Sequence, residues 1–152
     1  MEALAILPCG RRKIWDKNPA VGGVKAADAY IGVLHRLCRQ YASLYVGEWA
    51  VISGKHGLLL PDDIVPENYD VTFGQKHPDV ISIAQLKQQV IDKQLDQFPN
   101  IIALTGKKYQ PIIKQVFTTQ EIQYPLLGTK GIGKMQQLLK HSIEQGQPLH
   151  KQ

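Results

Sequence analysis

The sequence predicts an α/β fold, a three-layer sandwich with a mainly parallel sheet of four or five strands. Short runs that are apolar throughout alternate with longer segments in which apolar residues recur every three or four positions. Strands that are apolar on both sides are typical of parallel sheets covered by helices on both faces. Because 152 residues suit one hydrophobic core, we expect a single domain over residues 1–145 and a frayed polar tail over residues 146–152.

Four apolar runs are predicted to be strands, each bounded by proline, glycine or charged residues. They are residues 3–7, 49–53, 101–104 and 122–126. The carboxyl ends of parallel strands meet at one edge of a sheet, and ligands of open α/β sheets bind there. We therefore expect a site among the loops that follow these four runs.

Helices are predicted over the segments between these strands. They are residues 25–45, 78–96, 109–117 and 132–143, with apolar residues at helical spacing. Pro78 suits the first position of the second helix. Residues 9–24 and the acidic segment 61–77 are expected to be loops.

The net charge of +5 is unevenly distributed along the chain. Residues 1–60 carry eight basic and four acidic side chains, residues 61–100 carry three and seven, and residues 101–152 carry seven and two. A phosphate-rich partner, either nucleic acid or a nucleotide, fits the two basic portions. A generally basic surface is the alternative interpretation.

Composition also argues against several classes of protein. The sequence has no apolar run of the roughly 20 residues that a membrane span needs, and Met1 is not followed by features of a secretory signal. We expect a cytoplasmic protein with no membrane partner and with Cys9 and Cys38 reduced. His35 and Cys38 share a helical face, but no second pair at zinc spacing follows, so neither a metal nor another cofactor is expected.

The loop Ser53-Gly54-Lys55-His56-Gly57 follows the second strand and is the most informative motif. Lys55 could hold a phosphate or, if desolvated, act as a nucleophile. His56 titrates near neutrality, so it could act as an acid, a base or a hydrogen-bond donor. A solvated lysine and a histidine that caps a turn are the structural alternatives.

The first strand leads into a similar loop, Pro8-Cys9-Gly10-Arg11-Arg12-Lys13. Lys13 has the same two possible roles as Lys55. Cys9 lies beside three cations that could stabilise a nucleophilic thiolate. No histidine or aspartate partner is identifiable, so a small buried cysteine at a tight turn is the alternative.

Two further loops contain groups that an enzyme acting on a nucleoside would need. Tyr69 could stack on a base, and Asp70 could orient a water molecule. Thr105-Gly106-Lys107-Lys108-Tyr109 opens a helix and forms a plausible anion seat. The glycine-rich residues 128–134 lack the spacing of a nucleotide P-loop.

Taken in order, these motifs resemble a small prokaryotic and phage family of uncharacterised domains related to the YaaA-like peroxide-stress proteins. The specific part is Ser53-Gly54-Lys55-His56-Gly57-Leu58-Leu59. Weaker matches cover nearly the whole chain: Pro8-Cys9-Gly10 with Lys13, Pro19-Ala20, Tyr30-Ile31-Gly32, Pro61, Tyr69-Asp70, Thr72, Gly106, Tyr109, Pro125-Leu126 and Gly128. The Pro-Cys-x-x-x-Lys element also looks like one in archaeosine synthase, which modifies a tRNA base.

This resemblance implies a fold like that of uracil-DNA glycosylase and a site for a nucleobase or nucleotide. The Gly-Gln-Asp-Pro-Tyr motif of uracil glycosylases is absent. We expect an enzyme that acts on a base or an N-glycosidic bond in single-stranded or flipped-base DNA or in RNA. A non-catalytic nucleic-acid-binding stress or defence protein and a subunit that binds free nucleotides are the alternatives, and the oligomeric state stays open.

The expected enzyme assigns roles to twelve residues. Asp70, His56 and Lys55 form the catalytic group, in which Asp70 orients water. The substrate-binding group is Cys9, Gly10, Lys13, Tyr30, Ser53, Tyr69, Gly106, Lys108 and Tyr109. Within this group, Lys13 and Lys108 hold phosphates together with Lys55, Tyr69 stacks on a base, and Ser53 hydrogen-bonds the base with His56.

Overall fold

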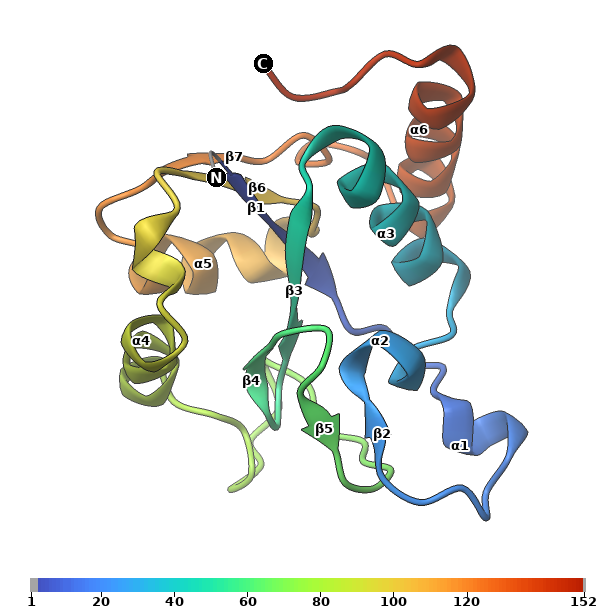
Figure 1. Ribbon diagram of the computed structural model, residues 1–152, viewed down its shortest axis with the longest axis vertical. Helices are drawn as coiled ribbons and strands as arrows, with labels where there is room; N and C mark the ends of the chain where they lie inside the picture. Colours follow the sequence, from blue (N-terminus) through green and yellow to red (C-terminus); the bar gives the residue numbers. More distant parts are fainter. Residues whose placement is uncertain (1–2, 152) are drawn as a thin grey trace.

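A computed structural model describes residues 3–151 as an α/β fold around a five-stranded sheet (Figure 1). The strands are β1 (Ala3–Pro8), β3 (Glu48–Ser53), β4 (Gly57–Leu59), β6 (Asn100–Ala103) and β7 (Glu121–Gln123), in the order β4-β3-β1-β6-β7. All neighbouring strands are parallel except β3 and β4, which form an antiparallel hairpin. The predicted α/β class with a mainly parallel sheet is therefore confirmed.

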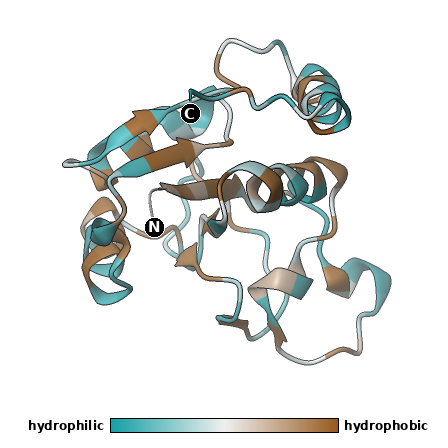
Figure 2. Ribbon diagram, turned by 45° about the horizontal axis from the view of Figure 1, so that its top comes forward, coloured by the Kyte–Doolittle hydropathy of each residue, from teal (hydrophilic) through white to brown (hydrophobic). Residues whose placement is uncertain are grey.

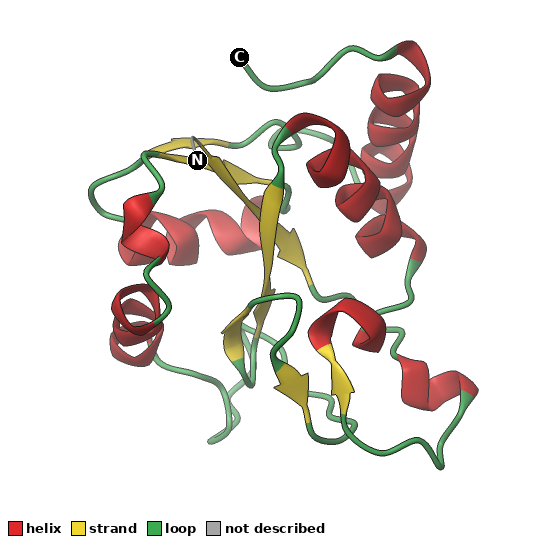
Figure 3. Cartoon of the chain, in the orientation of Figure 1, coloured by secondary structure: helices red, strands yellow, loops and turns green. Residues whose placement is uncertain are grey.

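Helices cover both faces of this sheet. On one face lie α3 (Val33–Tyr45) and α6 (Ile132–Gln145), and on the other lie α4 (Ile83–Asp92) and α5 (Gln110–Val116) (Figure 3). The strands are coloured mainly hydrophobic, whereas the helices alternate between the two colours, as amphipathic helices do (Figure 2). Within residues 3–151, no helix combines the length and hydropathy that crossing a membrane requires.

Shorter elements lie near the carboxyl ends of β1 and β3. They are α1 (Ile14–Lys17), α2 (Ala26–Ala29) and a two-stranded antiparallel ribbon of β2 (Val24–Lys25) and β5 (Ile64–Val65). Two short 3-10 helices, η1 (Leu95–Gln97) and η2 (Lys107–Tyr109), flank β6. The ribbon ties the segment before α3 to the acidic segment after β4, so both segments reach the same edge of the sheet (Figure 1).

Several predicted boundaries were wrong for local reasons. The helix predicted over 25–45 is interrupted between α2 and α3, because Tyr30 leaves the helix to form a bridge with Lys13. Pro78 is not helical. Helix α4 begins after Ser82, whose Oγ accepts a hydrogen bond from Gln85 N at 3.1 Å while Gln85 Oε1 accepts one from Ser82 N at 3.0 Å. This capping box is a stronger start signal than an isolated proline.

Residues 146–151 of the C-terminal segment, which the sequence predicts to be frayed, are held by hydrogen bonds, and Gln152 lies outside the described residues. Helix α6 ends at Gly146, which has a φ of +66°. The chain then returns to α3, where the hydroxyl of Tyr41 accepts hydrogen bonds from Leu149 N at 2.8 Å and His150 N at 3.2 Å. These bonds hold the tail although its composition is polar.

Candidate functional site at the carboxyl edge of the sheet

The carboxyl ends of β1, β3 and β6 lie side by side, as the fold class requires. Pro8 at the end of β1 pairs with Ile52 near the end of β3, and Leu104 N donates to Ile6 O at 2.9 Å. Ser53 is the last residue of β3, and Cys9 and Thr105 come shortly after β1 and β6; all three are buried. The edge is therefore built from polar side chains on top of an apolar sheet.

The turn between β3 and β4 shows why its sequence is so specific. Ser53 Oγ accepts hydrogen bonds from the backbone N–H of Lys55 at 3.3 Å and of His56 at 3.1 Å. A side chain at Gly54 would place Cβ 2.7 Å from Val71 O, so glycine allows the segment that contains Tyr69 to approach closely. The turn thus positions Tyr69 against Ser53.

Three hydroxyl groups form the centre of the site. Tyr69 Oη lies 2.7 Å from Ser53 Oγ, and it also forms a hydrogen bond with the hydroxyl of Tyr30. Because Ser53 Oγ already accepts two backbone N–H groups, its own hydrogen is donated to Tyr69. One bond between the two tyrosines uses a second hydrogen, and the Cys9 thiol is a further hydrogen-bond partner of Tyr69.

Burial raises the pKa of both tyrosines further above the ordinary value of 10, so both are protonated at neutral pH. Tyr30 and Tyr69 are 2% and 8% exposed. Burial, followed by the nearby Cys9 thiol, raises the pKa of Tyr69 to about 12, and burial followed by Tyr69 raises the pKa of Tyr30. The tyrosines can therefore donate hydrogen bonds to a ligand.

Lys13 adds a buried cation to these hydroxyls. It is only 5% exposed, and its Nζ lies 4.7 Å from the centroid of the Tyr69 ring. Nζ donates to Arg11 O at 3.2 Å, and no carboxylate of residues 3–151 forms an ion pair with it. A buried ammonium normally has an anionic partner, so this site has positive charge that the protein itself does not neutralise.

His56 completes what we call the Tyr69 cluster, namely Lys13, Tyr30, Ser53, His56 and Tyr69. The His56 and Tyr69 rings meet edge to face with centroids 4.9 Å apart. Burial, then Lys55, lowers the pKa of His56, so its imidazole is neutral at pH 7. Its Nε2 is buried and has no hydrogen-bond partner within residues 3–151.

An open cavity of about 390 Å³ reaches two residues of the cluster, Lys13 and Tyr69. It is lined by Arg11, Arg12, Lys13, Asp16, Asn68, Tyr69 and Asp70. Arg11 and Arg12 are exposed at its mouth, whereas Lys13 and Tyr69 are buried. This volume lies in the range of small-molecule sites, about 300–1,000 Å³.

The structure changes two of the roles predicted from sequence. Tyr69 is nearly buried, with Lys13 over its ring and His56 at its edge, so it does not offer an open face on which a base could stack. Cys9 has a raised pKa because burial outweighs the opposing effects of Lys13 and Lys108. It is therefore a thiol in this state, in agreement with the buried-cysteine alternative.

The other predicted residues lie around the cluster with different exposure. Asp70 is exposed on the cavity wall, and Lys55 is half-buried in the turn. Tyr109 interacts with Cys9, and burial followed by Cys9 raises its pKa. Lys108 is exposed, with Nζ 5.3 Å from the centroid of the Tyr109 ring. Gly10, with a φ of +78°, and Gly106 turn the chain after β1 and β6.

Two buried polar residues here, Thr105 and His35, are not among the twelve residues predicted for the site. Thr105 is 1% exposed, and its Oγ1 has no hydrogen-bond partner within residues 3–151. The sequence places it in a predicted anion seat without a role of its own. Its position directly after the predicted strand 101–104 was the feature that could have indicated a site residue. His35 was considered only as a metal ligand, but its Nδ1 lies 2.9 Å from Pro8 O and supports the end of β1.

The groups considered for zinc have other partners. The Cys38 thiol donates to Leu104 O at 3.6 Å, and burial lowers the pKa of His35 to about 4. Residues 3–151 contain no group of three or more histidine, cysteine, aspartate or glutamate side chains that could hold a metal ion. We therefore assign the two residues to packing and to support of the site.

Comparison with known proteins places the chain in a family. Residues 5–141 match the model of a family of unknown function, DUF6884. The chain is also 42% identical over 146 residues to the uncharacterized protein YfjM of Bacillus subtilis strain 168, covering 95% of this chain and 97% of that protein. Both matches include the loops that build the Tyr69 cluster, and the chain belongs to the family of unknown function DUF6884.

Proposed function

We propose that this protein is a nucleic-acid base-processing enzyme that acts on one nucleotide at the carboxyl edge of the sheet. The observation that supports the proposal is the position of Lys13. This buried cation has no carboxylate partner in residues 3–151, lies over the Tyr69 ring and lines the open cavity. Such a group favours a ligand that brings negative charge or strong acceptors. A nucleotide supplies both.

The distribution of charge in the cavity suggests how the nucleotide enters. Arg11 and Arg12 are exposed at the mouth, where they can hold phosphates of a strand that stays outside. Lys13 and the hydroxyl network are buried, where they can donate hydrogen bonds to acceptors of an inserted base. This differs from the expectation from sequence, in which Lys13 holds a phosphate. A base reaches this depth only from a single strand or after flipping out of a duplex.

Asp70 would then act at the N-glycosidic bond. Its carboxylate lies on the cavity wall beside Tyr69, where it would accept a proton from a water molecule that adds to C1′ of the sugar. The base would leave with the bonding electron pair, and His56 or a tyrosine hydroxyl would hydrogen-bond the departing base. We also propose that the protein is cytoplasmic and that it is related to the YaaA-like proteins and to the uracil-DNA-glycosylase fold.

A second candidate is binding without turnover, in stress response or defence or as a nucleotide-binding subunit. The exposure of Asp70 favours it, because a catalytic carboxylate is usually held rigidly by surrounding groups. In this case the same cations neutralise phosphates, but no bond breaks.

The test is incubation with single- and double-stranded oligonucleotides that carry normal, deaminated, oxidised or glucosylated bases. Mass spectrometry then identifies released or altered bases. We expect release by the unmodified protein and a loss of about 100-fold or more in Asp70→Asn, as for removal of a general base.

Asp96→Asn is the matched control, because Asp96 is exposed in η1 at the opposite end of β6. Its activity should equal that of the unmodified protein. Tight binding with no product would establish the second candidate, and equal loss in both variants would contradict the role of Asp70.

A further inference from the structure

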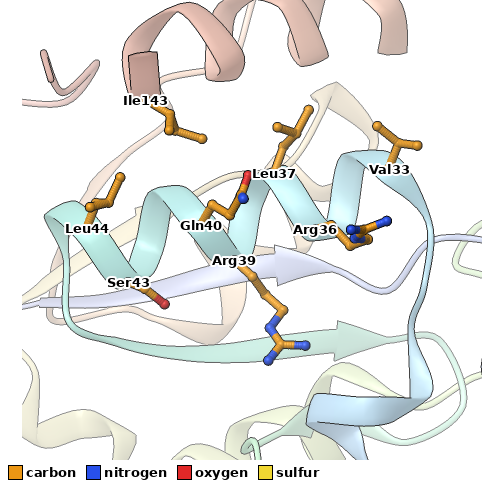
Figure 4. A pocket seen from close by; sticks show the side chains of 8 residues that line it. All are labelled: Val33, Arg36, Leu37, Arg39, Gln40, Ser43, Leu44 and Ile143. Carbon is orange, nitrogen blue, oxygen red and sulfur yellow. The ribbon is translucent and has the colours of Figure 1, made fainter. Parts of the chain in front are cut away.

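A second hollow lies on the opposite side of α3 from the sheet. It has a volume of about 750 Å³ and lies along α3, with Ile143 of α6 on its far side (Figure 4). We call it the α3–α6 groove. None of the residues of the Tyr69 cluster lines it, so its role is separate from that of the carboxyl edge.

The apolar residues of the groove follow the spacing of a helix-packing seam. Val33, Leu37 and Leu44 form a stripe along α3 in which Gln40 fills the remaining position. The successive steps of four, three and four residues match the heptad pattern by which helices pair. Val33 and Leu44 are 54% and 59% exposed, although apolar residues at this spacing usually form the buried face of a helix.

The length of the stripe limits what can cover it. Val33 and Leu44 are separated by eleven residues, which is about 16 Å along a helix at 1.5 Å per residue. The half-buried side chains of Leu37 and Ile143 line the groove between these exposed ends. A partner helix of about three turns would match this length.

The charge of the groove indicates what kind of helix fits. Its charged lining residues are Arg36 and Arg39, and no aspartate or glutamate lines it. Arg39 is fixed, because its guanidinium bonds Ala27 O and lies 5.0 Å from the centroid of the Trp49 ring. Arg36 is exposed at the start of the stripe. Two copies of this chain paired through the stripe would place the Arg36 side chains of both copies at the interface with no carboxylate from the groove, which disfavours self-association.

We propose that the α3–α6 groove binds an acidic amphipathic helix of another protein. Leucine-like side chains of that helix pack on Val33, Leu37 and Leu44, and a flanking carboxylate pairs with the exposed Arg36.

Binding of a designed peptide tests this proposal. The probe is a fluorescent 14-residue amphipathic peptide with leucines at heptad spacing and glutamates on its flanks, measured by fluorescence anisotropy with the full chain. The control peptide has lysine in place of each glutamate. We expect the acidic peptide to bind at least about ten-fold more tightly, a difference of about 1.4 kcal/mol.

Exposed apolar residues provide matched protein variants. Leu44→Glu should weaken binding of the acidic peptide by about ten-fold or more. Ile91→Glu is the control, because Ile91 is 60% exposed on α4, on the other face of the sheet, and this variant should bind normally. Arg36→Glu should reduce the preference for the acidic peptide.

Four results would overturn the proposal. They are equal binding of the two peptides, no binding of the acidic peptide, an equal effect of Leu44→Glu and Ile91→Glu, and dimerisation in sedimentation velocity that Leu44→Glu abolishes. The last result would assign the groove to a second copy of this chain. None of them bears on base release at the carboxyl edge.

Discussion

Two groups of buried tyrosines differ in whether their hydrogen bonds are complete. Tyr41 accepts bonds from Leu149 N and His150 N, so its hydrogen is donated to His150 Nδ1 at 2.5 Å. The hydrogen and both lone pairs of this hydroxyl are therefore all bonded to protein groups. The Tyr69 cluster instead contains an unpartnered His56 Nε2 and the Lys13 ammonium, which has no carboxylate partner in residues 3–151.

This difference distinguishes a structural polar cluster from a ligand site. Buried polar groups are nearly always satisfied, because an unpaired one costs about 1–3 kcal/mol. The bonds of Tyr41 hold the tail on α3. In the Tyr69 cluster, by contrast, His56 Nε2 has no hydrogen-bond partner and Lys13 no carboxylate partner within residues 3–151, so a ligand with complementary groups would gain free energy by pairing with them.

The largest effect is expected for Lys13→Met. This change removes the buried ammonium while keeping most of the side-chain volume, so base release should fall by about 100-fold or more. The free energy of unfolding should stay the same or rise, since an unpaired buried charge is removed. Kinetics of release and urea denaturation measure the two quantities.

Lys140→Ala is the control for Lys13→Met, because Lys140 is exposed on α6. It should leave both activity and stability unchanged. If Lys13→Met lost stability by several kcal/mol and its activity loss merely followed unfolding, Lys13 would be structural like Tyr41.

The next effect concerns His35, which supports the strand end beneath the site. Burial lowers its pKa from 6.5 to about 4, so folding favours the neutral form. Stability from this residue is complete above pH 6.5 and is lost as pH falls toward 4, by about 3 kcal/mol in total. Urea denaturation at pH 7.5 and pH 4.5 measures the loss.

The variant His35→Gln isolates this contribution, because glutamine does not titrate. Between pH 7.5 and pH 4.5, the free energy of unfolding of this variant should fall less than that of the unmodified protein, and the difference should be most of the about 3 kcal/mol assigned to His35. An identical pH dependence in both proteins would show that His35 is not the titrating group.

A smaller effect is expected for Tyr41→Phe. It leaves the N–H groups of Leu149 and His150 without their acceptor and should lower the free energy of unfolding by about 2 kcal/mol. Base release by the folded protein should be unchanged. Tyr45→Phe, which removes one bond to Ser142 O, should cost about 1 kcal/mol, and the reverse ranking would contradict the assignment.

The smallest effect is expected for Tyr30→Phe. The hydroxyl of Tyr30 bonds Tyr69 and interacts with Ser53. Because Ser53 and Tyr69 also bond each other, stability should change by less than about 1 kcal/mol. Base release should fall by about ten-fold because one hydroxyl of the network is lost. Full activity would show that the hydroxyl network does not touch the substrate.

Much of the fold could be predicted because parallel strands have a simple signature. The apolar runs that contain Leu7, Ile52 and Ile102 are buried on both faces, so no solvent-facing residues interrupt them. β4 was not predicted as a strand, because its three residues pair only after the tight turn at Ser53. The break before α3 depends on the bridge between Tyr30 and Lys13, a tertiary contact that helical periodicity cannot reveal.

The sequence predicts where in the fold the candidate site lies, but not which of its side chains are buried. Cys9, Ser53 and His56 lie at or just after the ends of strands, and that rule located them. The burial of Lys13 depends on packing against Tyr69, which is 56 positions away in the chain. The exposed and buried cations of residues 11–13 therefore look alike in sequence, and only the fold separates them.

The most direct test of the comparison is to map where a nucleic acid binds. Amide chemical shifts of the ¹⁵N-labelled protein would be followed while a short single-stranded oligonucleotide is added. The account predicts shifts concentrated at residues 9–13, 53–56 and 105–109, with little change at Tyr41 and the tail. Shifts concentrated at the tail or on α3, or none at the carboxyl edge, would contradict the claim that the unsatisfied cluster is the ligand site.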